Sequence, residues 1–559
     1  MSEMLTAVAI IFLLAGPFLV FANQYDLPVP PLLILAGVLA GFFIEEAIAL
    51  ELAQFGIALL LFTFGVGIQT TSIESVIADS EAAAFAQILV IGGLGAGFGL
   101  IVGLPPGETI FLGVAVALSS TIVATSHMQS EIRRNLIYGR LGESIQFVQD
   151  LFAVVFILVV TAGVVELDPI VLQIGYGVCF FIAAVLVNRY LFDAVGRFAG
   201  GSDELLIIGV VSLLVLFIGA AAAVGVPVVV GAFAAGLAVR HDRTEYLGLF
   251  NGLEAIKDFF VAIFFVVVGA LVVLPFVEIG TADSIEKLVL VAGLVVLTVL
   301  VKPAVTTAIL IYRGYESRAA TLTGLNTDQI SEFSLVIAIE ALLIGMLTQA
   351  VFDAIVLAAA VTMITSTVTQ RYNERIYRGL ATRGIVSGRH DKIDEQSEVP
   401  ADITDHVIVL GYSETGRRIV ETLEDLEQSY VVIETDPDLH EAVRIDCESY
   451  VLADAMEPYT WEKARAEEAR AVVSVTVSPV VSRRVLDLGL DATIVLRAET
   501  EREALDLLDL GSTYVAVPDL LAGEELIVRL EAVLSGETTA DGLRSAGQAE
   551  LENGFDRAD

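Results

Sequence analysis

The stretch Gly139-Arg-Leu-Gly-Glu-Ser-Ile-Gln-Phe-Val-Gln-Asp150 runs directly into the apolar segment Leu151-Phe-Ala-Val-Val-Phe-Ile-Leu-Val-Val160. A carboxylate at the start of so apolar a run would lie within or near a lipid bilayer, where an unpaired charge costs several kcal/mol. At about 100° per residue, Glu143, Gln146 and Asp150 fall on one helical stripe. The pattern predicts a cavity-lining stripe with Asp150 as its functional residue. The alternative is an interfacial aspartate that caps a helix.

The part of the chain before about residue 370 is a near-continuous series of apolar runs, and the chain of 559 residues is 56% hydrophobic. Such runs predict a polytopic α-helical membrane protein with about thirteen helices. The runs lie near 4–22, 30–44, 51–68, 82–104, 108–127, 142–165, 169–188, 203–224, 226–239, 256–274, 287–312, 329–347 and 349–370.

Basic residues gather in the loops on one side of these runs, and the loops on the other side hold only Lys287. Because basic loops stay in the cytoplasm, we expect a multi-pass plasma membrane protein with its N-terminus outside and its C-terminal domain in the cytoplasm. Four parts follow from the change in composition near residue 370. They are a transmembrane domain (1–370), a linker (371–402), a nucleotide-binding domain (403–520) and an acidic tail (521–559), which we expect to be disordered after Ser535.

The formal net charge of −38 excludes nucleic acid as a partner, because phosphate neutralisation needs clustered Lys and Arg. An acidic surface of this kind suits a cytoplasm rich in salt, so we expect a halophilic source.

Two of the apolar runs are expected to break. In the fifth, Ser119, Ser120 and Thr121 lie at membrane depth, where their hydroxyls can satisfy backbone groups freed by unwinding. In the twelfth, Asp328 and Glu332 stand among amides and hydroxyls. Paired polar breaks point to a transporter site at the bilayer midplane. The alternative is that both are polar helix ends capped by Ser, Thr and Asp.

Lys302, followed by Pro303, lies well inside the run that ends at Tyr312. A lysine at that depth must find a carboxylate, deprotonate or snorkel to the interface. We expect Asp150 to be its partner. An ion pair between the two that opens when a cation binds would give a route to exchange of cation for proton.

These residues resemble the monovalent cation:proton antiporter family, in its Kef-type branch of potassium efflux and sodium/proton antiporters. The resemblance covers most of the membrane region and includes Ala117-Leu-Ser-Ser-Thr121, Gln149-Asp150 and Gln329-Ile-Ser-Glu-Phe-Ser334. It implies thirteen helices in two inverted repeats, crossed broken helices, a dimerisation domain and a homodimer. It also implies an ion and proton site formed by Asp150, Gln149, Ser119, Ser120, Thr121, Lys302 and Glu332, with a monovalent cation at Asp150.

Gln149 occupies the place where electrogenic members of the family carry a second acid, which favours electroneutral exchange. Glu143 lies two turns away on the same stripe, so we include it among the candidate ion-binding residues and the stoichiometry remains open. Oxygen ligands serve both K⁺ and Na⁺, and the sequence therefore does not choose between them.

The segment from residue 405 alternates short apolar strands with amphipathic helices, which predicts a doubly wound Rossmann-like domain. Its first strand leads into Gly411-Tyr-Ser-Glu-Thr-Gly416, in which Ser413 replaces the middle glycine of a dinucleotide fingerprint. Glu434 ends the second strand, where an acid can accept hydrogen bonds from a ribose. The alternative is a scaffold that binds no ligand.

This segment resembles the TrkA-type regulator of potassium conductance (RCK) domain over roughly 404–520. The resemblance implies a regulatory adenine nucleotide, NAD(H), AMP or ATP. The residues implied to hold it are Gly411, Ser413, Gly416, Glu434, Asp436 and Asp454.

Together these features predict a secondary antiporter, not an enzyme, that exchanges K⁺ or Na⁺ for H⁺ under the control of a cytoplasmic nucleotide-binding domain. The alternatives are a nucleotide-gated K⁺ channel-like efflux protein and a sensor with a decayed transporter body. The sequence contains no filter of the Thr-Val-Gly-Tyr-Gly type that a potassium channel would need.

Overall fold

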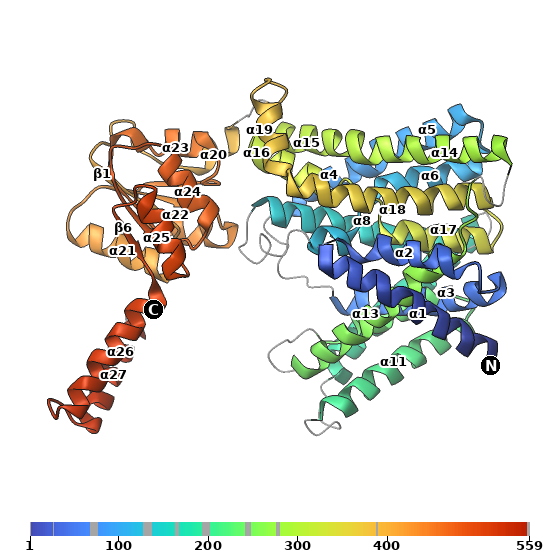
Figure 1. Ribbon diagram of the computed structural model, residues 1–559, viewed down its shortest axis with the longest axis horizontal. Helices are drawn as coiled ribbons and strands as arrows, with labels where there is room; N and C mark the ends of the chain where they lie inside the picture. Colours follow the sequence, from blue (N-terminus) through green and yellow to red (C-terminus); the bar gives the residue numbers. More distant parts are fainter. Residues whose placement is uncertain are drawn as a thin grey trace. The chain divides into compact units, whose positions relative to one another are not determined.

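The computed structural model describes residues 2–25, 27–67, 77–126, 137–161, 167–192, 202–240, 247–275, 280–386 and 390–555. The chain divides into two compact units, Met1–Arg389 and His390–Asp559. The first unit is helical and the second contains a sheet (Figure 1).

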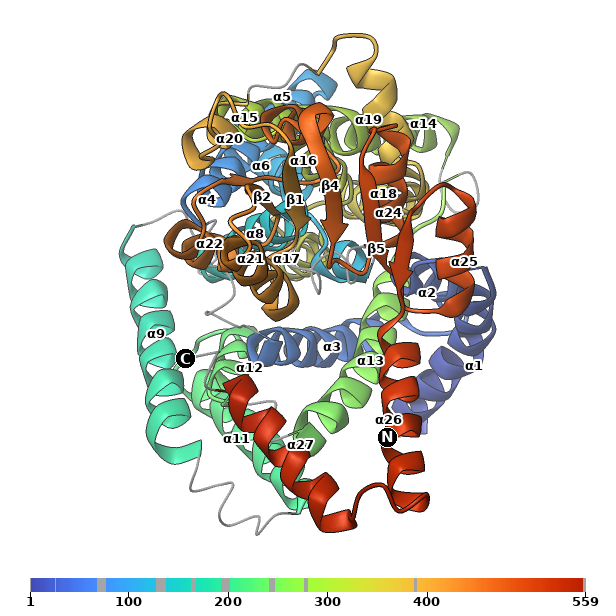
Figure 2. The same ribbon diagram turned by 90° about the vertical axis from the view of Figure 1, so that its left-hand side faces the viewer.

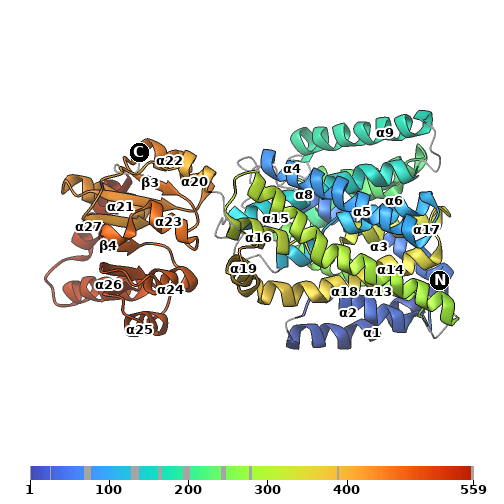
Figure 3. The ribbon, with the colours of Figure 1, turned by 90° about the horizontal axis from the view of Figure 1, so that it is seen from above.

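The first unit has two groups of helices, which we call the scaffold layer and the bundle layer (Figure 2). In the scaffold layer, α1 and α9 lie at opposite edges (Figures 2 and 3). The scaffold layer consists of α1 (Ser2–Tyr25), α2 (Val29–Ala40), α3 (Glu46–Gly67), α9 (Leu167–Leu186) with the π-helix η2 (Val187–Leu191), α11 (Asp203–Ala223), α12 (Val228–Leu237) and α13 (Leu247–Ala270).

In the bundle layer the same order of parts occurs twice, which agrees with the expected repeat. A helix with a π-helical turn is followed by a broken helix and then by an unbroken one. The first set is α4 (Ile77–Ala86), η1 (Gln87–Ile91), α5 (Gly92–Val102), α6 (Pro106–Ala117) with residues 121–126, and α8 (Ile137–Thr161). The second is α14 (Thr281–Val296), η3 (Leu297–Val301), α15 (Lys302–Tyr312), α16 (Ser317–Leu325), α17 (Glu332–Leu343) and α18 (Gln349–Arg371).

Within the described residues, nine helices are long and apolar enough to cross a membrane, and three shorter apolar helices accompany them. The expected polytopic helical architecture is confirmed, whereas the number thirteen stays a prediction. Both helices expected to break are interrupted, at residues 118–120 and 326–331.

Glycines bring the scaffold helices into backbone contact. A Cβ atom on Gly37 of α2 would lie 2.0 Å from the Val266 carbonyl oxygen of α13, and one on Gly269 would lie 2.1 Å from the Ile34 carbonyl oxygen. The crossing of α3 and α12 is built in the same way: a Cβ atom on Gly236 would lie 2.1 Å from the Phe62 carbonyl oxygen. Such crossings let membrane helices pack without large side chains between them.

The sequence suggests that Lys287 lies in an outer loop. In the structure it lies on α14 and is only 2% exposed. Its ammonium pairs with Asp353 of α18 and donates to the Val273 carbonyl oxygen at 2.8 Å. Asp353 also accepts from the Val273 N–H at 3.2 Å, and Gln349 donates to the Leu271 carbonyl oxygen at 2.9 Å. The residues that follow α13 are therefore fastened to the bundle layer.

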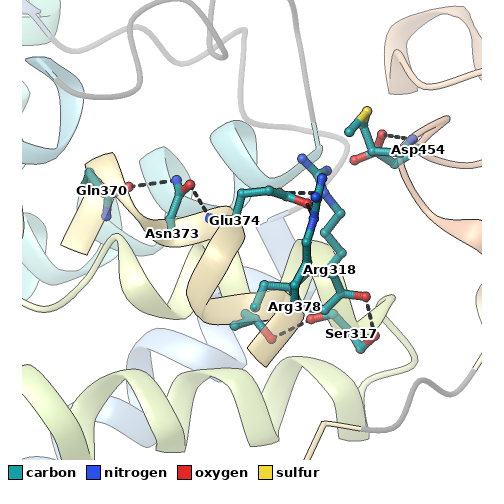
Figure 4. A network of polar contacts seen from close by, with 10 residues as sticks. Ser317, Arg318, Gln370, Asn373, Glu374, Arg378 and Asp454 are labelled. Carbon is teal, nitrogen blue, oxygen red and sulfur yellow. Dashed lines mark hydrogen bonds and ion pairs between the residues drawn. The ribbon is translucent and has the colours of Figure 1, made fainter. Parts of the chain in front are cut away.

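A short amphipathic helix, α19 (Asn373–Ala381), is tied to α16 by polar contacts (Figure 4). Arg318 Nε donates to Glu374 Oε2 at 3.2 Å, and Arg378 forms an ion pair with the same carboxylate. Ser317 and Tyr377 share a hydrogen bond between their hydroxyls. The first residues of the predicted linker are thus ordered against the helix that leads into the second break.

The second unit contains a six-stranded parallel sheet in the order β3-β2-β1-β4-β5-β6, as the alternation of strands and helices predicts. The strands are β1 (His406–Leu410), β2 (Tyr430–Glu434), β3 (Tyr450–Leu452), β4 (Ala469–Ser474), β5 (Thr493–Arg497) and β6 (Tyr514–Ala516). The helices around it are α20 (Asp391–Gln396), α21 (Glu414–Asp425), α22 (His440–Asp446), α23 (Pro458–Lys463), α24 (Pro479–Asp487) and α25 (Glu501–Asp509), with short 3₁₀ turns at Pro437–Leu439 and Ala466–Glu468. The order reverses between β1 and β4, the place where doubly wound sheets bind ligands.

The expected disorder after Ser535 is wrong. The chain continues from α26 (Pro518–Leu534) into a further helix, α27 (Ala540–Phe555). The segment is rich in Gly, Ala and acidic residues, a composition that also occurs in disordered tails. Ala, Glu and Gln are good helix formers, however, and the segment forms a helix.

Candidate functional site

Asp150 lies on α8 inside the bundle layer and is 1% exposed. Thr121, the first residue after the break in the fifth apolar run, donates its hydroxyl hydrogen to Asp150 Oδ2 at 2.7 Å. The Glu332 carboxylate of α17 acts on Asp150 as a like charge. Two buried acids that repel each other favour the uptake of a positive charge between them.

Both breaks meet beside these acids. The Ser119 hydroxyl donates to the Thr327 carbonyl oxygen at 3.3 Å, and Gln329 Nε2 donates to the Ser120 carbonyl oxygen at 3.2 Å. Backbone groups freed by one interruption are thus satisfied by side chains of the other, as expected for broken membrane helices. Ser119, Ser120 and Thr121 all lie at this junction.

Glu332 begins α17, where Ser331 caps the helix by accepting from the Phe333 N–H at 3.0 Å. Glu332 Oε1 accepts from the Ile122 N–H at 3.3 Å, and the Ser120 hydroxyl lies beside this carboxylate. Glu332 Oε2 is buried and has no hydrogen-bond partner among the residues that the structure describes. A buried carboxylate oxygen without a hydrogen-bond partner is a ligand that a monovalent cation can use.

Lys302 does not pair with Asp150. Its ammonium donates to the Leu118 carbonyl oxygen at 3.0 Å and to the Gln329 carbonyl oxygen at 2.8 Å, one in each break. In the described part of the chain no ion pair joins Lys302 to Asp150. The expected pair with Asp150 is therefore wrong, and Asp328 acts on Lys302 electrostatically instead.

Gln149 forms hydrogen bonds with the backbone of the first break. Its side chain also bonds to Gln87, a residue that the sequence analysis did not identify. Gln149 Oε1 accepts from the Ser119 N–H at 2.9 Å, and its amide donates to Gln87. Gln87 lies in η1 and also donates to Thr306 and, at 3.2 Å, to Thr327. An amide inside an otherwise apolar run was the available signal.

Glu143 is not brought to this junction. It lies half-buried on α8, and its electrostatic partner is Arg140, one turn earlier. Glu143 and Asp150 lie on the same face of α8, as expected. The two helical turns between them place Glu143 away from the two breaks.

In the second unit, the two outer glycines of the turn after β1 are required by its geometry. Gly411 has a φ of +96°, which favours glycine. A Cβ atom on Gly416 would lie 2.1 Å from the Gly411 carbonyl oxygen, so α21 can pack on the strand end only with glycine there. Ser413 is exposed at the N-cap of α21 and uses no side-chain capping bond. Its position leaves the helix N-terminus open to a phosphate.

The Glu434 side chain, expected to contact a ribose, is largely occupied by hydrogen bonds within the protein. Its carboxylate accepts hydrogen bonds from three backbone N–H groups, those of Tyr412, Thr435 and Asp436. Burial raises the pKa of Glu434 above its usual range, and these three bonds oppose the rise. Because a carboxylate has about four acceptor positions, one position remains for a ligand hydroxyl.

Asp436 and Asp454 complete the carboxyl edge of β1, β2 and β3. Asp436 Oδ1 accepts from the Asp438 N–H at 2.9 Å, and Asp454 Oδ1 accepts from the Met456 N–H at 2.8 Å (Figure 4). Thr435 links the ends of β2 and β3 through the Ala453 carbonyl oxygen at 3.1 Å. All six residues expected at the nucleotide site therefore lie along one edge of the sheet.

Two broken helices that meet at a buried pair of acids, in a bundle of apolar helices, define a membrane transporter of monovalent cations. The chain belongs to the family of transmembrane sodium/hydrogen exchangers, whose profile matches residues 8–371. A second family profile, the TrkA-N domain, matches residues 407–518. The resemblances found in the sequence are thus confirmed.

The most similar relatives include a candidate K(+) efflux antiporter, KefB, of Alkalimonas amylolytica. It is 26% identical over 547 residues, which cover 93% of this chain and 80% of the relative. The glutathione-regulated potassium-efflux system protein KefC of Klebsiella pneumoniae is 25% identical over 454 residues, covering 79% and 69%. These relatives are transporters, and the expectation that the chain is not an enzyme is confirmed.

Among solved structures, the sodium proton antiporter MjNhaP1 of Methanocaldococcus jannaschii is similar to the first unit. It is 15% identical, covers 67% of this chain and 98% of its own, and has a TM-score of 0.49.

Proposed function

We propose that this cation/proton antiporter exchanges K⁺ for H⁺ by alternating access, and that a nucleotide bound to the second unit controls its rate. The observation that carries the proposal is the buried meeting of Asp150 and Glu332 at the junction of the two breaks. In the described residues, no lysine or arginine forms an ion pair with Asp150. A cation and a proton can therefore compete directly for this acid.

In the proposed cycle, ionised Asp150 takes a cation from one side of the membrane and a proton from the other. Thr121 stabilises the ionised carboxylate through its hydrogen bond, and Glu332, Ser120 and the freed carbonyl groups supply further oxygen atoms. Only one of the two positive charges fits at a time, and this competition couples their opposite movements.

K⁺ is favoured over Na⁺ because relatives named as potassium efflux proteins align along most of the chain. The proposal extends to a plasma membrane homodimer with its N-terminus outside, its second unit in the cytoplasm and a salt-rich cytoplasm as its setting. The edge formed by Gly411, Ser413 and Gly416 supports an adenine nucleotide, NAD(H), AMP or ATP, as the regulatory ligand.

Transport is tested in proteoliposomes with an internal pH-sensitive dye, by adding KCl or NaCl to wild-type protein and to Asp150→Asn. We expect a proton flux that K⁺ elicits in the wild type and that the variant lacks. Size-exclusion profiles show whether the variant is folded. Flux that persists in folded Asp150→Asn contradicts the assigned site, and a larger response to Na⁺ reverses the assigned cation.

Nucleotide binding is tested by thermal unfolding of the full-length protein, followed through Trp461, the one tryptophan of the chain. Trp461 is buried in the second unit and therefore reports on that unit. We expect NAD(H), AMP or ATP to raise the melting temperature. Ser413→Glu adds a charge where the phosphate approaches and should remove the rise, whereas Ser535→Glu, at an exposed distant serine, should retain it. No rise with any nucleotide leaves only a scaffold.

A further inference from the structure

Asp328 is a buried acid with no use in the cycle described above. It lies in the second break and is 0% exposed, and within the described part of the chain neither of its carboxylate oxygens has a hydrogen-bond partner. The hydroxyls of Ser366 and Thr369 on α18 lie beside it. Each of them donates elsewhere, Ser366 to Gln329 Oε1 at 3.3 Å and Thr369 to the Thr365 carbonyl oxygen at 3.2 Å. A buried carboxylate without hydrogen-bond donors needs a positive charge nearby to remain ionised.

Lys302 supplies that charge. Its ammonium has three N–H groups, and two of them are used by the Leu118 and Gln329 carbonyl oxygens. The third N–H donates to no described residue, and Asp328 directly precedes Gln329, whose carbonyl oxygen Lys302 contacts. The two charged groups lie beyond the ion-pair distance of 4.0 Å in this structure, and they attract each other electrostatically. Asp150 is engaged differently, by the Thr121 hydroxyl and the like charge of Glu332.

We propose that Asp328 is the counter-ion of Lys302, and that the two act as a positioning pair which holds the two breaks together. Lys302 bonds to one carbonyl group of each break, and Asp328 is attached to the second break next to one of them. The inference deepens the proposed function, on which it rests. It also replaces Asp150 as the acid that balances the buried lysine.

The consequence for exchange is that a cation reaches Asp150 without first breaking an ion pair. Lys302 keeps its charge and its carbonyl contacts while Asp150 changes partner. The two breaks, which carry Thr121 and Glu332, then keep their spacing through the cycle. A residue that acts through spacing changes the maximal rate, whereas a residue that coordinates the cation changes the KM for the cation.

The test compares the full-length variants Lys302→Met, Asp328→Asn and the double variant in the proteoliposome assay, with melting temperatures measured in parallel. Lys302→Met leaves Asp328 as an unpaired buried acid, and we expect a lower melting temperature and a loss of flux of at least about tenfold. Asp328→Asn should lower the maximal rate and leave the KM for K⁺ unchanged. Adding Asp328→Asn to Lys302→Met should restore most of the melting temperature, because no unpaired buried acid remains. The flux should stay low, because the carbonyl contacts of Lys302 are still absent.

Three results overturn the proposal. The first is a double variant that is no more stable than Lys302→Met. The second is a large rise in the KM for K⁺ in Asp328→Asn, which makes Asp328 a cation ligand. The third is a changed KM in folded Lys302→Met with no rescue by Asp328→Asn, which restores Asp150 as the partner. Failure of the proposed function itself shows separately, as wild-type protein without flux.

The pair Lys287 and Asp353 provides a matched control, because it is also a buried lysine and aspartate in the same unit. Its double variant, Lys287→Met with Asp353→Asn, removes an equal charge far from the two breaks in sequence. Asp328→Asn must fail to rescue Lys287→Met. If it does rescue, the effect is a general relief of buried charge and the specific pairing is refuted.

Discussion

The hydrogen bond from Thr121 to Asp150 offers a test at the scale of one atom. Thr121→Val keeps the branched shape and removes the hydroxyl that stabilises the ionised acid. Since hydrogen bonds to charged groups contribute about 1.5–3 kcal/mol, we expect the KM for the transported cation to rise by roughly ten- to hundredfold. The measurement is the cation dependence of proton flux.

Thr109→Val is the control for this substitution, because the Thr109 hydroxyl bonds only to the Pro106 carbonyl oxygen of its own helix, at 2.9 Å. An equal rise in KM in both variants would show that Thr121 has no special role at Asp150.

His406 predicts a pH dependence of the second unit. The ring is buried on β1, and its Nε2 is 3.0 Å from the Ala464 carbonyl oxygen. Its Nδ1 has no hydrogen-bond partner among the described residues. Burial lowers the pKa of His406 below its ordinary value. The unfolded state then binds more protons than the folded state, so stability falls as pH drops below about 6.5. Denaturation followed through Trp461 should show this loss.

His406→Gln keeps a donor for the Ala464 carbonyl oxygen and cannot take up a proton. Its stability should therefore change less between pH 7 and pH 5 than that of the wild type. If both proteins lose stability equally over this range, other groups control the acid response.

The candidate site shows what residue patterns can and cannot predict. Asp150 and Glu332 stand out because a charge inside an apolar run needs a reason. Gln87 is a single amide in a run that an ordinary membrane helix also explains, and only folding brings it to Gln149. The partner of Lys302 was assigned wrongly because sequence gives the list of acids and not their distances.

At the scale of elements, the crossing of α3 and α12 predicts a sharp effect of one methyl group. Gly236→Ala would place a Cβ atom 2.1 Å from the Phe62 carbonyl oxygen, and rigid backbone atoms cannot move aside. We expect a destabilisation of about 1–3 kcal/mol, seen as a lower melting temperature in detergent. Gly219→Ala on α11, where no atom lies within 4 Å, should be neutral or stabilising. Equal effects would mean that the crossing is loose.

Element boundaries followed from the sequence where the pattern was strong. The first two strands of the second unit appear where the sequence places them, before Gly411 and up to Glu434, because turn-forming residues mark their ends. α27 was missed because composition alone was used to infer disorder. The π-helical turns η1 and η3 had no signal, since one extra residue per turn leaves an apolar run unchanged.

At the scale of the whole molecule, the net charge of −38 predicts a dependence on salt. Acidic groups repel one another over about 10 Å at 0.1 M salt and over about 3 Å at 1 M. The melting temperature reported by Trp461 should therefore rise with KCl up to molar concentrations. Choline chloride at equal ionic strength separates screening from K⁺ binding, because screening acts equally in both salts. A melting temperature that does not respond to either salt contradicts the halophilic expectation.

The glycine crossing of α2 and α13 and the Lys287 ion pair together form a tether between the two layers. Gly269 is locked against α2, whereas Val273, four residues later, is bonded to Asp353 of α18. Four residues reach at most about 14 Å even when fully extended. While both contacts hold, this span limits how far the two layers can be displaced from each other at this point. Under that condition, a displacement of the bundle larger than this span requires rotation about this point.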